Sequence, residues 1–159
     1  MKTNKTKWIL LGICIAIPLA VGGLSAWVTN ESMEAFSALN QPPLSPPGWL
    51  FPVVWSILFT LMGIASYLYL TAMPPMSQAP KGLLLYGLQL LFNFFWSIWF
   101  FNLQAYGFAF VWLLALWVLI LATILQFAKV SKPAAYLLIP YLVWVTFAGY
   151  LNLGIALLN

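Results

Sequence analysis

The sequence predicts an all-α integral membrane protein, folded as one domain over residues 1–159 into a bundle of five transmembrane helices. The 159-residue chain is 64% hydrophobic and 5% charged, whereas a soluble domain carries about 25% charged residues. Five apolar runs are each long enough to cross the hydrocarbon core of a bilayer, which requires about 20 residues. The expected spans are residues 8–28, 51–70, 82–101, 106–128 and 134–158. The linkers between the later spans are short, so consecutive helices should be antiparallel neighbours.

The first span follows a basic segment like that of a signal peptide. Its apolar run is longer than the roughly 7–15 residues of a signal-peptide core, so we expect it to remain as a helix. Gly12, Ala16 and Ala20 recur at every fourth position along it. Small residues in line allow two helices to approach closely. This stripe is therefore predicted either to pack within the bundle or to form the contact of a homodimer.

The connection between the first two spans, residues 29–50, is the longest in the chain. Pro42, Pro43, Pro46 and Pro47 fall within six positions, and Gly48 follows. Proline fixes the backbone angle φ, so a loop built in this way loses little entropy when it closes. We interpret this loop as a rigid lid over a pocket for a flat, apolar ligand.

Polar and aromatic side chains recur on one face of the second and third spans. In the second span, Trp55, Phe59 and Met62 share a face. In the third span, the corresponding face carries Gln89, Asn93, Trp96, Ser97 and Phe100. An amide in hydrocarbon needs a partner, so this face should point into the bundle. Two interpretations remain open, namely interhelical hydrogen bonding and the polar wall of a ligand pocket.

The fifth span places Pro140, Trp144, Ala148 and Asn152 at intervals of four residues, and we expect them on one face. Pro140 removes a backbone hydrogen bond, so it is expected to kink the helix or to open a groove. Ala148 is small and would leave room for a ligand beside Trp144.

The lysines predict the topology. All six lie in the N-terminal segment, the second loop and the fourth loop, which five spans place on one side of the membrane. Glu31 and Glu34 lie in the first loop, on the other side. Basic loops stay in the cytoplasm. The N-terminus is therefore expected in the cytoplasm and the lid on the opposite side.

Residue types that common enzyme chemistry needs are missing. The chain has no histidine or aspartate, two glutamates in one loop, and a single cysteine, Cys14. These counts exclude a Ser-His-Asp triad and an internal disulfide, and they leave no cluster of metal ligands. Conventional acid–base or nucleophilic catalysis is not expected. The lysines are scattered and form no basic face, so we expect no nucleic-acid partner.

Three stretches together resemble the TspO/translocator-protein family, also called the tryptophan-rich sensory protein or peripheral-type benzodiazepine receptor family. They are QPPLSPPGWLFPVVW, QLLFNFFWSIWFF and LLIPYLVWVTFAGYLN, and the resemblance runs from about residue 8 to residue 158. It implies a five-helix membrane bundle, often a homodimer. It also implies binding of porphyrins such as protoporphyrin IX, and of drug-like ligands, in a pocket beneath the first loop.

The resemblance also implies which residues form that pocket. Trp55 and Trp144 match its paired tryptophans, and Ala148 matches the small position beside the ligand. The remaining matches are Asn93, Trp96 and Ser97 on the third helix and Pro46, Pro47 and Gly48 in the lid.

The sequence departs from the family pattern at several positions. Phe36 replaces a tyrosine and removes one possible hydrogen bond to the ligand, Gln41 replaces a lysine, and Leu44 replaces a tryptophan. Tyr150 is not followed by the basic residue of the proposed sterol motif, so sterol binding through that motif is not expected.

Three functions follow as hypotheses. In the first, the protein binds a tetrapyrrole and serves porphyrin homeostasis or signalling; aromatic side chains including Phe36 and Phe59 enclose the ring, and Gln89 and Asn93 orient its polar groups. The porphyrin is then the ligand, and no cofactor is required. In the second, Trp55 and Trp144 support light-dependent porphyrin degradation. In the third, the protein regulates a partner without catalysis. Membrane lipid is expected as a further partner.

Overall fold

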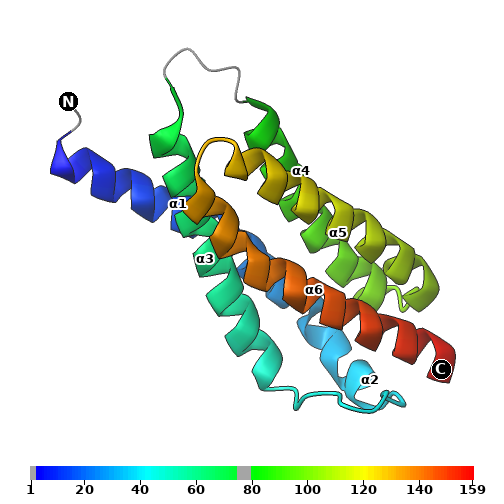
Figure 1. Cartoon of the computed structure of the whole chain (residues 1–159). Helices are drawn as coiled ribbons and strands as arrows, with labels where there is room; N and C mark the ends of the chain where they lie inside the picture. Colours follow the sequence, from blue (N-terminus) through cyan, green and yellow to red (C-terminus); the bar gives the residue numbers. More distant parts are fainter. Residues whose placement is uncertain (1–2, 75–79) are drawn as a thin grey trace.

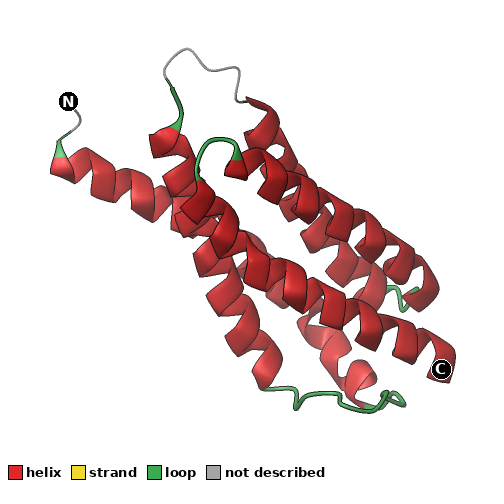
Figure 2. Cartoon of the chain, in the orientation of Figure 1, coloured by secondary structure: helices red, strands yellow, loops and turns green. Residues whose placement is uncertain are grey.

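The computed structural model describes residues 3–74 and 80–159, and its long elements are all helices (Figures 1 and 2). The long helices are α1 (Asn4–Thr29), α3 (Leu50–Ala72), α4 (Pro80–Ser97), α5 (Tyr106–Ala128) and α6 (Lys132–Leu158). The short elements are a 3₁₀ turn (Asn30–Ser32), α2 (Met33–Ser37) and a π-helical turn (Ile98–Asn102) that continues α4. Within the described ranges there is no strand. Five helical segments are long and apolar enough to cross a membrane, which confirms the predicted fold class.

The helices pack in a ring whose order differs from their order in the sequence. α1 lies along α3, α3 along α6, α6 along α5, and α5 along α4 (Figure 1). The expectation that consecutive helices are close neighbours therefore holds for α4, α5 and α6. It is wrong for α3 and α4, whose backbones lie farther apart. The side chain of Tyr69 on α3 extends across to α4, where a Cβ added to Gly82 would lie 2.4 Å from its hydroxyl oxygen. The closest backbone neighbours of α3 are α1 and α6.

Glycines bring α1 and α3 together. A Cβ added to Gly63 would lie 2.4 Å from the Cα of Ile15 and 2.7 Å from the carbonyl oxygen of Cys14. A Cβ added to Gly22 would lie 2.4 Å from the ring of Phe59. The absence of a side chain at these two positions is therefore what allows the two backbones to approach.

The stripe Gly12, Ala16 and Ala20 takes no part in this contact. All three residues are exposed, and a Cβ on Gly12 would meet nothing within 4 Å. The interpretation that this stripe packs within the bundle is therefore wrong. The physical reason is helical geometry, because Gly12 lies two residues before buried Cys14 and hence about 200° away around the helix. Its role as a homodimer contact stays a prediction.

The two ends of the bundle differ in charge. The described lysines lie at the start of α1, the start of α4 and the turn between α5 and α6, which form one end in Figure 1; they are Lys5, Lys7, Lys81, Lys129 and Lys132. Glu31 and Glu34 lie at the other end, with the lid and the C-terminus. Lys2 lies outside the described residues. The charge split that five spans require is thus present, and the cellular side of each end stays a prediction.

The first part of the predicted lid loop is helical. The chain leaves α1 through the 3₁₀ turn and α2, so only residues 38–49 lack helical structure. This differs from the expected loop over residues 29–50, because no proline lies between residues 29 and 41 to interrupt a helix. The lid is therefore a short helix followed by a proline-rich strap.

Candidate functional site

A buried polar cluster ties three helices together in the middle of the bundle. The hydroxyl of Tyr141 on α6 donates to Oε1 of Gln89 at 2.7 Å and accepts from Nδ2 of Asn93 at 2.7 Å. All three residues are at most 3% exposed. Nε2 of Gln89 also lies 3.9 Å from the sulfur of Met62 on α3. Gln89 and Asn93 face inward as expected, and in this structure they bond to the protein itself.

A second polar group lies nearer the lid. Nε1 of Trp96 donates to Oδ1 of Asn152 at 3.0 Å, and Nδ2 of Asn152 donates to the backbone carbonyl of Tyr106 at 2.8 Å. Trp96 and Asn152 are both buried. These bonds join α4, α5 and α6 and satisfy both side chains, as the interpretation of interhelical hydrogen bonding expects. Ser97 is buried beside them, where α4 passes into the π-helical turn.

Aromatic rings from α3 lie against the polar cluster. The ring of Trp55 stacks on Phe59 with centroids 5.5 Å apart, and it meets the ring of Tyr141 edge-on at 6.2 Å. One turn nearer the lid, Phe51 meets Trp144 of α6 edge-on at 5.9 Å. The facing sides of α3 and α6 thus form a wall of aromatic rings that begins directly behind the lid.

Trp144 has a hydrogen-bond donor without an acceptor. Its Nε1 atom is buried and has no hydrogen-bond partner among the described residues. Trp96, Trp112 and Trp117, by contrast, each donate from this atom at 2.9–3.0 Å. Trp99 also has a buried, unpartnered Nε1, but its ring lies among rings of α4 and α5. The indole of Trp144 therefore places a buried donor without a partner in the wall between α3 and α6.

The predicted site residues divide into two sets. The structure brings together Trp55, Phe59, Gln89 and Asn93 around Tyr141, and it buries Trp96, Ser97 and Ala148 in the bundle. The lid residues are more peripheral: Pro46 is half-buried, whereas Pro47 and Gly48 are exposed at the start of α3. Phe36 of α2 packs on the rings of Phe100 and Phe101, at 5.8 and 5.2 Å. It covers the π-helical turn.

Pro140 does not share a face with the other residues of its stripe. It is exposed, whereas Ala148 and Asn152 are buried, and α6 continues through it without a break. A step of four residues turns the helix about 40° beyond a full circle, so the stripe rotates by about 120° between Pro140 and Asn152. The expectation of one common face is wrong for this reason.

Tyr141 is the functional residue that the sequence interpretation missed. The available signal was a hydroxyl group inside a span, three residues before Trp144. A tyrosine in a span is also common at the membrane interface, so the signal alone did not indicate an interior role.

Hydrogen bonds also fix the segment that follows α1 to the rest of the bundle. Oγ of Ser32 donates to Oδ1 of Asn102 at 2.6 Å, and Nδ2 of Asn102 donates to the carbonyl of Val28 at 3.2 Å. The π-helical turn therefore holds the start of the lid through one asparagine.

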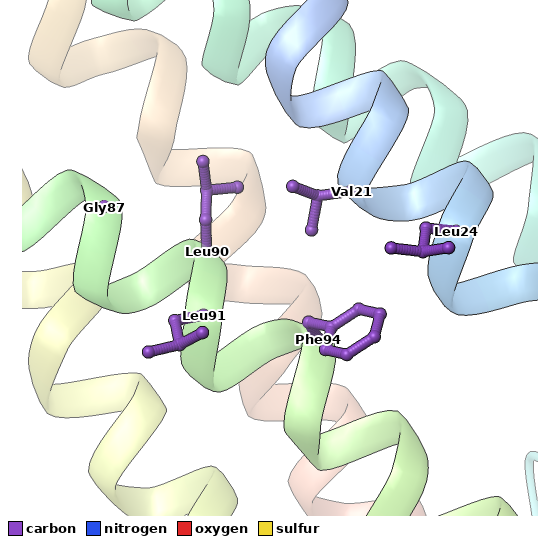
Figure 3. A pocket seen from close by; sticks show the side chains of 6 residues that line it. All are labelled: Val21, Leu24, Gly87, Leu90, Leu91 and Phe94. Atoms are coloured by element: carbon purple, nitrogen blue, oxygen red, sulfur yellow. The ribbon is translucent and has the colours of Figure 1, made fainter. Parts of the chain in front are cut away.

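An open groove lies between α1 and α4 (Figure 3). Its volume is about 320 Å³, and it is lined by Val21, Leu24, Gly87, Leu90, Leu91 and Phe94. This lining is apolar throughout, which suits contact with hydrocarbon chains of the bilayer.

The site chemistry consists of rings, amides and one phenol. Among residues 3–74 and 80–159, no group of three or more His, Cys, Asp or Glu side chains lies close enough to hold a metal ion. The arrangement offers flat apolar surface with a few fixed polar atoms, which is the composition of a binding site for a small apolar molecule.

Comparison with known proteins identifies relatives over almost the whole chain. Residues 14–158 match the model of the TspO/MBR family. The tryptophan-rich protein TspO of Chlorobaculum tepidum is 41% identical over 152 residues, which cover 95% of this chain and 96% of the relative. The translocator protein of Ovis aries is 38% identical over 127 residues, 79% of this chain and 75% of the relative. The translocator protein of Bos taurus is 38% identical over 138 residues, which cover 86% of this chain and 82% of the relative.

Proposed function

The chain belongs to the TspO/MBR family, and from that membership we propose that it binds a flat, apolar tetrapyrrole such as protoporphyrin IX behind the lid. It is an integral membrane protein with five spans. The ligand in this proposal lies against the aromatic wall between α3 and α6, and the lid covers it from the end of the bundle.

The observation that carries the proposal is the free indole N–H of Trp144. A buried donor without an acceptor raises the free energy of the folded protein by about 1–3 kcal/mol. A ligand that supplies an acceptor recovers part of that free energy on binding. A porphyrin combines a flat apolar ring with carboxylate groups at its edge, so it offers both a surface for stacking and an acceptor.

The polar cluster supports the proposal in a different way from the one expected. Gln89 and Asn93 already bond to Tyr141, and the ring of Tyr141 contacts Trp55. We therefore assign these amides a positioning role, in which they fix the aromatic wall before the ligand arrives. A wall that is already ordered loses less side-chain entropy on binding.

Fluorescence titration in the dark tests the proposal. Protoporphyrin IX should quench the tryptophan fluorescence of the wild-type protein saturably. Trp144→Phe keeps a ring and loses the N–H, so its Kd should rise about fivefold, which corresponds to one hydrogen bond of about 1 kcal/mol. Trp27→Phe is the matched control, because Trp27 lies on α1 and is 76% exposed.

Two results would contradict the proposal. One is quenching that never saturates in either protein, which indicates that the porphyrin partitions into the detergent micelle. The other is an equal Kd for wild type and Trp144→Phe. Light-dependent porphyrin degradation and regulation of a protein partner stay hypotheses from the sequence.

A further inference from the structure

The last two turns of α6 hold the proline-rich strap by side-chain hydrogen bonds. Nδ2 of Asn159 donates to the backbone carbonyl of Asn40 at 2.9 Å, and Oδ1 of Asn159 accepts from the backbone N–H of Asn40 at 3.0 Å. One amide thus satisfies both backbone groups of a residue 119 positions away in the sequence. Nδ2 of Asn159 also donates to the carbonyl of Ile155 at 2.9 Å, which fixes its orientation at the helix end.

A glycine on the same helix makes room for the strap. Pro42 is buried, and a Cβ added to Gly154 would lie 2.6 Å from Cβ and Cγ of Pro42. Glycine weakens the interior of a helix relative to alanine. Gly154 therefore has a packing role, because its missing side chain leaves the notch that the ring of Pro42 occupies.

A third contact lies one turn before the notch. The hydroxyl of Tyr150 donates to the backbone carbonyl of Pro43 at 2.7 Å. The strap residues involved, Asn40, Pro42 and Pro43, are almost consecutive. Their partners are close in sequence as well: Tyr150 and Gly154 lie about one turn apart on α6, and Asn159 is the residue that follows the last turn of the helix.

The strap turns sharply directly after these contacts. Leu44 has φ 68°, in the left-handed region that residues with a side chain rarely adopt. Its side chain is 84% exposed, so packing of Leu44 does not hold this conformation. The contacts on either side hold it: the docked residues before it, and the hydrogen bond from Oγ of Ser45 to the carbonyl of Pro42 at 2.7 Å. A strained residue that its neighbours hold favours release once those contacts break.

Aromatic contacts connect this region to the candidate site. The ring of Tyr150 lies 6.2 Å from that of Phe147, and the ring of Phe147 lies 5.6 Å from that of Trp144. Trp144 carries the buried donor without a partner. Two successive ring contacts on α6 therefore connect Tyr150, which binds the strap, to Trp144, which contacts the ligand in the proposal.

We infer that Tyr150, Gly154 and Asn159 form a latch that positions the lid over the ligand site and limits the rate of ligand release. This inference rests on the proposed function, since it takes the ligand to lie behind the lid. A ligand leaves when the lid opens, so the release rate follows the population of the open lid. Breaking the latch raises that population.

Gly154→Ala is the variant that tests the latch most directly. The new methyl group would overlap the ring of Pro42, whereas alanine is favoured over glycine in the helix itself. The matched control is Gly149→Ala on the same helix, because its Cβ would make only an ordinary contact, 3.6 Å from Cδ2 of Leu113. A difference between these two variants therefore reports on the strap rather than on helix stability.

Two measurements apply to each variant. Hydrogen exchange at the backbone N–H of Asn40 reports on the latch without any ligand. Stopped-flow dissociation of protoporphyrin IX in the dark reports on release. In Gly154→Ala both rates should rise about tenfold, a factor that corresponds to about 1.4 kcal/mol. In Gly149→Ala both should stay within about twofold of wild type, the scatter expected of a change worth less than 0.5 kcal/mol.

A second variant separates the notch from general damage. Pro42→Gly removes the ring with which the new methyl group collides. If the notch acts as inferred, Pro42→Gly/Gly154→Ala should release protoporphyrin IX no faster than Pro42→Gly alone. A double variant that releases faster than both single variants would show that Gly154→Ala acts elsewhere.

The outcomes distinguish this inference from the proposed function. Unchanged exchange at Asn40 in Gly154→Ala overturns the latch. Faster exchange with an unchanged dissociation rate overturns its control of release and leaves the proposed function intact. Absence of saturable binding by the wild-type protein contradicts the proposed function and the control of release together, while exchange at Asn40 still decides whether the latch exists.

Discussion

At the scale of single residues, Tyr141 connects the two kinds of chemistry in the site. Its hydroxyl bonds to Gln89 and Asn93 of α4, and its ring contacts Trp55 of α3. A side chain that is fixed at both ends fixes its neighbours as well. Tyr141 therefore fixes the part of the aromatic wall that Trp55 forms.

Tyr141→Phe tests this role. The substitution keeps the ring and leaves the oxygen of Gln89 and the nitrogen of Asn93 without a partner in the interior. Hydrogen bonds inside membranes contribute on average about 0.6 kcal/mol and at most about 1.7, so we expect a loss of about 1–2 kcal/mol for two bonds. Thermal unfolding in detergent should show a lower Tm. Tyr136→Phe, on the same helix and 62% exposed, should leave Tm unchanged, and equal Tm values for both variants would refute the role.

The sequence predicted which polar residues of the site are buried, but it did not predict the side chains to which they bond. The four-residue spacing of Gln89 and Asn93 predicted an inward face, and both are buried. Their bond to Tyr141 depends on how α6 is rotated against α4, and no pattern within one helix contains that rotation. The lid contacts Tyr150, Gly154 and Asn159 were hidden for the same reason, since each acts on a residue more than 100 positions away.

At the scale of elements, the contact between α1 and α3 depends on Gly63. Gly63→Ala should destabilise the protein by about 1–3 kcal/mol, because the methyl group would meet the backbone of α1, which cannot move aside as a flexible side chain can. Gly12→Ala is the control, since its Cβ has nothing within 4 Å. Chemical unfolding in detergent compares the two. Equal stability of the two variants would show that α1 and α3 pack less closely than described.

The spans were predictable because length and apolarity suffice to find them. Each predicted span lies within a few residues of a long helix or its π-helical extension. Which stripe of small residues packs inside was not predictable. Helix α1 carries the stripe that starts at Gly12 and also the small residue Gly22, and only the position of Phe59 on α3 distinguishes them. The helical start of the lid was missed because proline-rich composition dominated the interpretation of the whole loop.

At the scale of the whole molecule, the lysine-bearing end should face the cytoplasm, because basic loops are retained there. In a Cys14→Ser background, Gln41→Cys in the lid should react with a membrane-impermeant thiol reagent in intact cells. Asn4→Cys, at the start of α1, should react only after lysis. Both positions are exposed, so accessibility is decided by the membrane alone. Labelling of Asn4→Cys in intact cells would reverse the orientation.

The central claim is that a flat ligand meets the free indole N–H of Trp144 behind the lid. The most direct measurement is the ¹⁵N-indole spectrum of the nine tryptophans, titrated with protoporphyrin IX in the dark. The signal of Trp144 should shift saturably, and the signals of Trp8 and Trp27, 72% and 76% exposed on α1, should stay in place. If Trp8 and Trp27 shift as much as Trp144, or if Trp144 does not move at saturation, the ligand does not occupy this site.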